Sequence, residues 1–204
     1  MTYFDFRAQM IPFGCFSLGQ ARGVFPNMDY SNLTRWTGKG YLVHLRQNWY
    51  AFHEMNDIPD FNRHIAERIY RPSYLSLHWA LAFYGIIPEA VTELTSVTTL
   101  KTSHFSNPFG EFDYQTIKPS LMWGYRQTQT TNGKVYLVAE PEKALVDLLY
   151  LNSTYNTVDD MLNLRLDEDY MLNEFCWDTL DKYAIRTGSK ILQKRTEALK
   201  QAYG

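Results

Sequence analysis

Two segments decide how most of the chain folds: RPSYLSLHWALAFYG at residues 71–85 and AEPEKALVD at residues 139–147. Pro72 keeps the start of the first segment extended, because the residue before a proline avoids helical backbone angles. Ser76 is then placed to cap a helix that ends at Gly85. The buried side of this helix repeats at helical spacing, through Leu77, Ala80, Leu81 and Tyr84. The first segment therefore predicts an extended stretch followed by a short buried helix.

The second segment predicts another helix start. Pro141 falls at the favoured first position of a helix, and the acidic residues around it complement the positive end of the helix dipole. Lys143 and Asp147 are four residues apart and face one another on the helix surface. The inward side consists of Ala144, Leu145, Leu148 and Leu149. Because the polar residues of both segments have such structural roles, Ser76 is interpreted as a cap and not as a nucleophile.

The sequence between these segments predicts an antiparallel sheet. The strand candidates share a period of two and many β-branched residues, and they cover residues 94–99, 112–118, 121–128 and 134–138. Asn132-Gly133 marks a hairpin turn before the last strand, and residues 104–110 are expected to form a loop. The rest of the chain is expected to be helical, over residues 158–166, 170–183 and 189–203.

The first 53 residues predict three short helices followed by a β-hairpin. The hairpin alternates over residues 41–46 and 49–52 around the polar turn Gln47-Asn48. Three helices and a two-stranded wing follow the order of a winged helix-turn-helix domain. We therefore expect an α+β protein with a winged helix-turn-helix domain at residues 1–53 and a bridging helix within residues 54–70. A C-terminal domain of antiparallel sheet and helices is expected at residues 71–204.

The third of these helices carries the side chains most suited to DNA. It buries Tyr30, Leu33 and Trp36, and Asp29 is placed to cap its start. The residues left outward, or following at the wing, are the DNA-contact candidates Ser31, Asn32, Thr34, Arg35, Lys39, Arg46 and Gln47. Arginine and asparagine can form paired hydrogen bonds with guanine and adenine, whereas serine, threonine and lysine reach phosphates. The alternative interpretation is an ordinary hydrophilic surface on a small folded unit.

Charge is distributed unevenly along the chain. Residues 1–53 hold five basic and two acidic side chains, residues 54–181 hold nine and nineteen, and residues 182–204 hold six and one. Both ends are therefore basic around an acidic middle, which fits terminal elements that meet a polyanion. The basic face of the last helix consists of Lys190, Lys194 and Arg195. Solvated helix surface is the simpler alternative.

Signatures of catalysis, cofactors and metals are missing from the sequence. It contains no phosphate-binding glycine loop, His-Glu-x-x-His site or Cys-x-x-Cys pair, and its five histidines are scattered. Glu140, Glu142 and Asp147 could form a Mg²⁺ cluster, but helix-end electrostatics and the pairing of Asp147 with Lys143 explain them more simply. No apolar stretch reaches the ~18 residues of a membrane span. We therefore expect a soluble, cytoplasmic protein with no metal, no cofactor and no enzymatic activity.

The two segments also resemble the AbiEi-type antitoxin family. The resemblance lies in PSYLSL, ALAFYG and AEPEKALVDLLY at residues 72–77, 80–85 and 139–150, in their order and separation, and in the last helices. It implies the antitoxin of a type IV toxin–antitoxin pair in an abortive-infection system, which represses its own operon by binding double-stranded operator DNA. In that family the C-terminal domain counteracts a nucleotidyltransferase-like toxin without a stable complex. For the antitoxic surface the candidates are Lys190, Lys194 and Arg195.

Two other functions remain open. A protein-interaction module could bind and neutralise a toxin directly without DNA, through the acidic middle and an exposed aromatic loop at residues 105–112. A metal-dependent nuclease or transferase could be built on Glu140, Glu142 and Asp147. A stable complex with the product of the neighbouring gene would favour the interaction module over a DNA-binding regulator.

Overall fold

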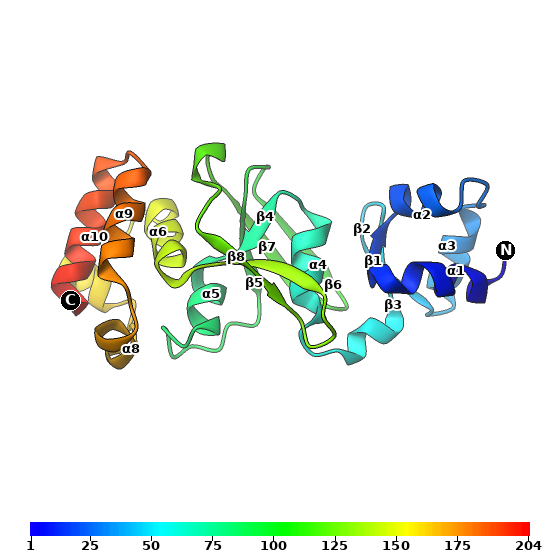
Figure 1. Ribbon diagram of the computed structural model, residues 1–204, viewed down its shortest axis with the longest axis horizontal. Coiled ribbons are helices and arrows are strands. Elements are labelled where there is room, and N and C mark those ends of the chain that lie inside the picture. The colour runs from blue at the N-terminus through cyan, green and yellow to red at the C-terminus, as the bar shows by residue number, and fades with distance from the viewer.

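The computed structural model describes all residues from Met1 to Gly204, and they form three blocks along one long axis (Figure 1). Helices and a small three-stranded sheet form the N-terminal block, a six-stranded mixed sheet forms the middle, and helices form the C-terminal end. This arrangement confirms the predicted α+β class.

The N-terminal block combines helices with an antiparallel sheet of strand order β1-β3-β2. Its elements are α1 (Tyr3–Met10), the 3-10 helix η1 (Ile11–Phe13), β1 (Cys15–Ser17), α2 (Leu18–Val24), α3 (Ser31–Gly38), β2 (Leu42–Arg46) and β3 (Trp49–Phe52). Ser17 caps α2, because its hydroxyl accepts the N–H of Gln20 at 3.2 Å while the Gln20 side chain accepts the N–H of Ser17. Phe6, Trp36 and Phe52 are buried and form the aromatic core of the block.

The bridge consists of the 3-10 helix η2 (His53–Asp57) and helix α4 (Phe61–Ile69). The buried side of α4, which includes Ile65 and Ile69, packs against the central sheet. Its first residue, Phe61, also contacts the N-terminal block at Gly14. Gly14 has a φ of +69°, and a Cβ at this position would lie 2.7 Å from the Phe61 ring, so only glycine fits. The predicted bridging helix is therefore a layer of the central block that also holds the N-terminal block.

The central sheet has the strand order β6-β7-β5-β4-β9-β8. Its strands are β4 (Ser73–Leu75), β5 (Leu94–Thr98), β6 (Ser103–Asn107), β7 (Gly110–Thr116), β8 (Tyr125–Gln129) and β9 (Val135–Ala139), and the 3-10 helix η3 (Pro119–Leu121) lies between β7 and β8. The expected hairpin at Asn132-Gly133 is confirmed by the antiparallel pairing of β8 with β9.

The sheet is mixed and not antiparallel as predicted, and it contains one strand that was not expected. Strand β4 pairs in parallel with β9, and β5 pairs in parallel with β7. Residues expected to form a loop are instead the edge strand β6 and its turn into β7. Period-two alternation identifies a strand but carries no information about its neighbour or direction, so the mixed topology could not be derived from it.

Helices cover both faces of this sheet. They are α5 (Leu77–Phe83), α6 (Pro141–Leu151), α7 (Val158–Leu162), α8 (Glu168–Asn173), α9 (Trp177–Arg186) and α10 (Lys190–Tyr203). The Tyr114 hydroxyl donates to the carbonyl of Ala66 on α4, whereas the Tyr74 hydroxyl reaches Asp147 on α6. Helix α4 therefore lies on one face, and α5 and α6 lie on the other. The last helices pack against the outer side of α6.

A buried polar network joins the segments at residues 71–85 and 139–147. Lys143 contacts Asp147, and Asp147 also accepts hydrogen bonds from Tyr74 at 2.9 Å and from Ser76 at 2.8 Å. The side chains of Lys143 and Asp147 are only 1% and 2% exposed. Burial raises the pKa of the Asp147 carboxyl and lowers the pKa of the Lys143 ammonium, and their mutual contact opposes both shifts. The predicted surface pair is therefore an interior one.

The Lys143 side chain occupies the space beside Gly124. A Cβ at Gly124 would lie 3.0 Å from the Lys143 stem, and its φ of +73° is rarely adopted by other residues. The Lys143 nitrogen lies 4.8 Å from the centre of the Trp123 ring and 5.5 Å from the centre of the Tyr74 ring. Aromatic faces and a carboxylate thus replace water around this ammonium.

The predicted cap role of Ser76 is wrong. Its hydroxyl donates to Asp147, and no N–H of α5 bonds to it. The cap comes instead from the neighbouring strand β5, where the Thr95 hydroxyl accepts the N–H of Trp79 at 3.2 Å and donates to the carbonyl of Ser76. A donor or acceptor supplied by another strand leaves no trace in local sequence spacing.

We expect Lys143→Met to lower the free energy of unfolding by about 3 to 5 kcal/mol, because it leaves the Asp147 carboxylate buried without its cation. Urea denaturation at neutral pH measures this loss. Lys200→Met is the matched control, since it removes a cation from the half-exposed pair with Asp181 and should cost no more than about 1 kcal/mol. Equal losses in the two variants would contradict the interior role of the Lys143–Asp147 pair.

Candidate nucleic-acid interface

Helix α3 is fixed by two buried side chains and by a polar group at its start. Leu33 and Trp36 are 1% and 2% exposed and hold the helix on the aromatic core. The Asp29 carboxylate accepts the N–H of Ser31 at 2.9 Å and the hydroxyl of Ser31 at 2.7 Å. Asp29 therefore accepts the N–H of the first residue of α3, although the cap position predicted for it is occupied by Tyr30.

The outward face of α3 presents most of the predicted DNA contacts. Ser31, Thr34 and Arg35 are exposed, and Lys39 is exposed directly after the helix. Asn32 is half-buried, and its side-chain oxygen accepts a hydrogen bond from Arg35 at 2.7 Å. Five predicted residues are therefore brought together on one short helix and its end. Arg35 and Asn32 are bonded to each other, so contact with bases would require them to exchange partners.

The structure does not place Arg46 where the sequence predicted it. Its guanidinium is not at a free wing tip but donates to the carbonyl of Ile69 at 2.8 Å. It also lies over the rings of Tyr70 and Phe105, at 4.9 and 4.2 Å from their centres. Arg46 therefore joins strand β2 to the central block. Gln47, the next residue, is exposed in the turn of the β2–β3 hairpin and remains a candidate.

Arg22 is a basic residue that sequence reasoning missed. It is exposed on α2, and its guanidinium lies 4.3 Å from the centre of the Tyr30 ring, directly before α3. The other cations of the block are already engaged, since Arg7 pairs with Glu54 at 2.7 Å and Arg46 faces the central block. The exposed cations of the block that pair with no carboxylate are therefore Arg22, Arg35 and Lys39.

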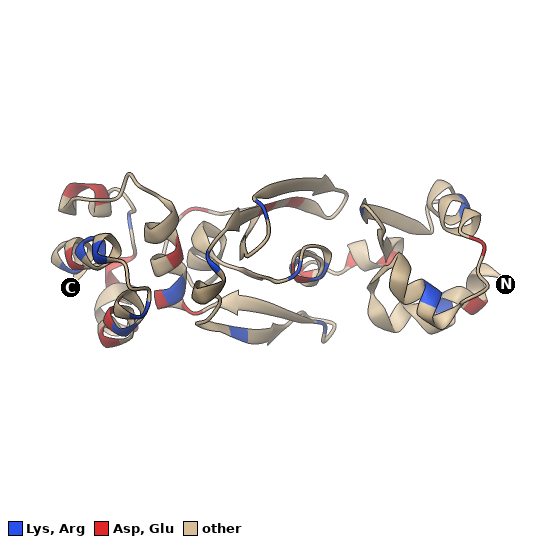
Figure 2. Ribbon diagram, turned by 90° about the horizontal axis from the view of Figure 1, so that it is seen from above, with Lys and Arg blue, Asp and Glu red and all other residues tan.

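The basic face predicted on the last helix is smaller than expected. Lys190 and Lys194 are exposed, but Arg195 is buried, where it donates to the carbonyl of Leu149 at 2.6 Å and to the Asn156 side chain at 3.0 Å. Arg195 follows Leu192 by three residues, so it lies on the packed side of α10. Acidic as well as basic residues occur on the C-terminal helices (Figure 2). Arg195 therefore does not belong to the exposed basic face of α10.

The three acids considered for Mg²⁺ have separate partners. Glu140 accepts the hydroxyl of Tyr183, the buried Glu142 accepts the N–H of Cys176 at 3.1 Å, and Asp147 faces Lys143. They do not converge on one point. A different group does converge, formed by Glu93, His104 and Asp113, whose ligand atoms all lie within 4.8 Å of one another. Sequence reasoning missed it, because its residues come from separate parts of the chain.

Comparison with models of known protein families gave no match, and comparison with curated protein sequences gave none either. The resemblance to antitoxins therefore rests on the three sequence stretches at residues 72–77, 80–85 and 139–150 and on the last helices. No helix of the chain is both long and apolar enough to cross a membrane.

Arg46→Ala should destabilise the protein by about 1 to 3 kcal/mol, because it removes a hydrogen bond to a carbonyl and two contacts with aromatic faces. Gln47→Ala, one residue away in the exposed turn, should change the free energy of unfolding by less than about 0.5 kcal/mol. Urea denaturation of both variants gives the comparison. A fully stable Arg46→Ala protein would show that this contact does not hold the two blocks together.

Proposed function

We propose that the protein is a DNA-binding transcriptional autorepressor and the antitoxin of a type IV toxin–antitoxin pair, a regulator and not an enzyme. The observation that carries the DNA-binding part is the order of the N-terminal block. Helix α1, strand β1, helices α2 and α3 and the β2–β3 hairpin follow one another, and the sheet order is β1-β3-β2. A helix-turn-helix with a β-hairpin wing has this order, and its third helix enters the major groove.

The chemistry of α3 supports the same proposal. Ser31 and Thr34 are suited to phosphate oxygens, and Arg35 and Asn32 can read base edges once they separate from each other. Lys39 at the end of the helix and Arg22 beside Tyr30, directly before its start, are exposed and add positive charge. Double-stranded operator DNA is the partner that we propose for this surface.

The β2–β3 hairpin, which is the wing, has less surface free for DNA than the wing of an isolated winged domain. Strand β2 packs against β6 of the central sheet, and Arg46 points into that contact. Only the turn at Gln47 extends from the hairpin to solvent. We therefore propose that α3 supplies the main contacts with DNA and that the wing supplies one at its tip.

The antitoxin part of the proposal is supported by the two family-like segments and by the exposed lysines of α10. The segments form the buried scaffold of the central block, so they do not themselves meet a partner. Lys190 and Lys194 are the remaining candidates for an effect on a nucleotidyltransferase-like toxin. An electrostatic surface of this kind suits an action without a stable complex, because exposed charges contribute little affinity.

The alternative of a direct toxin-binding module loses its main support. It was based on the acidic middle of the chain and on an exposed aromatic loop, but in that loop Phe112 is fully buried, Phe109 is 8% exposed, and Phe105 is half-buried beneath Arg46. These aromatic side chains belong to the β6–β7 hairpin and face α4 or the N-terminal block. They are not available to a partner.

Arg35→Ala and Lys39→Ala should each weaken binding to DNA from upstream of the protein's own gene, measured by gel shift. Removing the hydrogen bonds of Arg35 to a base should cost about 1 to 3 kcal/mol on the operator and much less on unrelated DNA. Removing the charge of Lys39 beside a phosphate should weaken binding to both DNAs and lower the salt dependence by about one counterion.

Lys118→Ala is the matched control, because Lys118 is exposed on the central block, away from α3. Its operator affinity should equal that of the unchanged protein. Operator affinity that is unaltered in both α3 variants would show that α3 is not the recognition surface.

Co-expression with the product of the neighbouring gene tests the antitoxin part. We expect growth to be restored without a complex that survives size-exclusion chromatography, and Lys190→Glu combined with Lys194→Glu should reduce the protection while leaving operator binding intact. A stoichiometric complex would instead favour the direct toxin-binding module.

A further inference from the structure

One face of the sheet edge formed by β6 and β7 is polar and open to solvent. Side chains alternate along these strands, so Phe105, Phe112 and Tyr114 face the interior, whereas the residues between them face outward. The outward residues include His104 on β6 and Asp113 opposite it on β7. Helices α5 and α6 lie on this same face but cover only its central strands.

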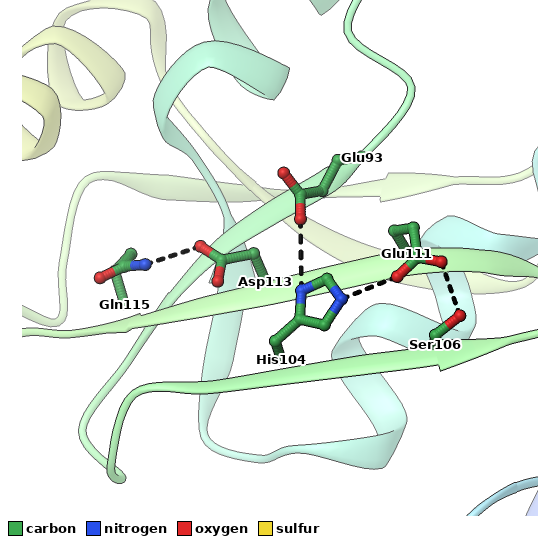
Figure 3. A network of polar contacts seen from close by, with 6 residues as sticks. All are labelled: Glu93, His104, Ser106, Glu111, Asp113 and Gln115. Atoms are coloured by element: carbon green, nitrogen blue, oxygen red, sulfur yellow. Dashed lines mark hydrogen bonds and ion pairs between the residues drawn. The ribbon is translucent and has the colours of Figure 1, made fainter.

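Three carboxylate side chains, Glu93, Glu111 and Asp113, lie around the His104 ring (Figure 3). The ring nitrogen Nε2 lies 2.7 Å from Oε2 of Glu111, and the other nitrogen, Nδ1, lies 3.3 Å from Oε1 of Glu93. Ligand atoms of Glu93, His104 and Asp113 are mutually within 4.8 Å. The group brings three carboxylates to one imidazole, and no lysine or arginine pairs with any of them.

The contacts of His104 differ at its two nitrogens. Nε2 makes a short hydrogen bond with Glu111, whose other oxygen accepts the hydroxyl of Ser106 at 2.6 Å. Nδ1 makes no hydrogen bond but faces the carboxylates of Glu93 and Asp113. A neutral histidine that donates Nε2–H to a carboxylate presents an unprotonated Nδ1. A lone pair beside carboxylate oxygens is repulsive unless a proton or a metal ion lies between them.

This arrangement is the one that protein metal sites use. Histidine ligands almost always donate their second ring N–H to a carboxylate, a backbone carbonyl or water, which fixes the ring and increases the basicity of the coordinating nitrogen. Here Glu111 is the carboxylate that accepts the second ring N–H of His104. The Ser106 hydroxyl donates a hydrogen bond to Glu111 and so orients it. The amide of Gln115 donates to Oδ2 of Asp113 at 2.7 Å, which orients the second carboxylate in the same way.

We propose that Nδ1 of His104 and one carboxylate oxygen each of Glu93 and Asp113 bind a divalent transition-metal ion of the Zn²⁺ class, with Glu111 as the residue that orients the imidazole. One nitrogen and two oxygens are a ligand set that zinc accepts, with water completing the shell on this exposed face. Two ligands about 2.05 Å from a zinc ion at the tetrahedral angle are roughly 3.3 Å apart. The distance from Nδ1 to Glu93 has this value.

The three ligands come from different parts of the sheet edge. Glu93 directly precedes β5, His104 lies on the edge strand β6, and Asp113 lies on β7. A bound ion therefore ties the edge hairpin to β5. Binding to the folded protein alone should raise its stability in proportion to the logarithm of the metal concentration above the dissociation constant.

Isothermal titration of Zn²⁺ into the full chain, together with thermal melts at several Zn²⁺ concentrations, tests the proposal. We expect one saturable site and a melting temperature that rises with Zn²⁺. His104→Ala should abolish both effects. Glu111→Gln should weaken binding by about 10-fold or more while the protein stays folded, because an amide orients the ring but no longer increases the basicity of Nδ1.

Two controls exclude binding elsewhere. His53→Ala removes an exposed histidine that is not part of this cluster, and Cys176→Ser removes the exposed thiol, so both should bind Zn²⁺ as the unchanged protein does. Asp113→Asn is the second ligand variant and should lose affinity without unfolding, since Asp113 is partly exposed. The proposal is overturned if Zn²⁺ gives no saturable heat, or if His104→Ala, Asp113→Asn and the unchanged protein bind it equally.

Discussion

The interior depends on one buried ion pair. Lys143 and Asp147 lie one turn apart on α6, and the carboxylate also accepts the hydroxyls of Tyr74 and Ser76. Strand β4, the start of α5 and helix α6 are thereby fixed to one another at the centre of the chain. Removing one partner of a buried ion pair is strongly destabilising, because it leaves the other charge buried and unpaired. The packing of α6 against β4 therefore depends on all four polar groups keeping their partners.

Local signals in the sequence predict local structure correctly. Asp29 bonds to the start of α3, close to where its spacing indicates, and Asn132-Gly133 turns the β8–β9 hairpin. Predictions fail where a partner comes from a distant segment. Ser76 has the spacing of a cap, but Thr95 on β5 occupies that role, and the parallel neighbours of β4 and β5 are likewise set by chain crossings that alternation does not encode.

The same limit applies to the candidate surfaces. The outward residues of α3 could be predicted, because helical periodicity separates Leu33 and Trp36 from the polar side. Arg46 and Arg195 could not be placed, since a basic residue in a turn or on a helix is equally compatible with solvent and with an interior carbonyl. Long arginine side chains pack their stems and satisfy carbonyls at junctions between elements. Counting charge along the chain therefore overestimates the positive surface at both ends.

Strand β6 carries one ligand of the proposed metal site and also contacts the N-terminal block. On β6, His104 faces outward while the next residue, Phe105, faces the opposite way and carries the Arg46 guanidinium on its ring. Asn107, at the end of the same strand, reaches the carbonyl of Leu45 on β2. An ion that restrains His104 would restrain the strand on which the wing rests, because a short edge strand pairs with β7 alone. The contacts of β6 with β2 hold the wing, and they would also determine the position of α3 relative to the central block. Metal binding and DNA binding would therefore both affect the contact between the N-terminal block and β6.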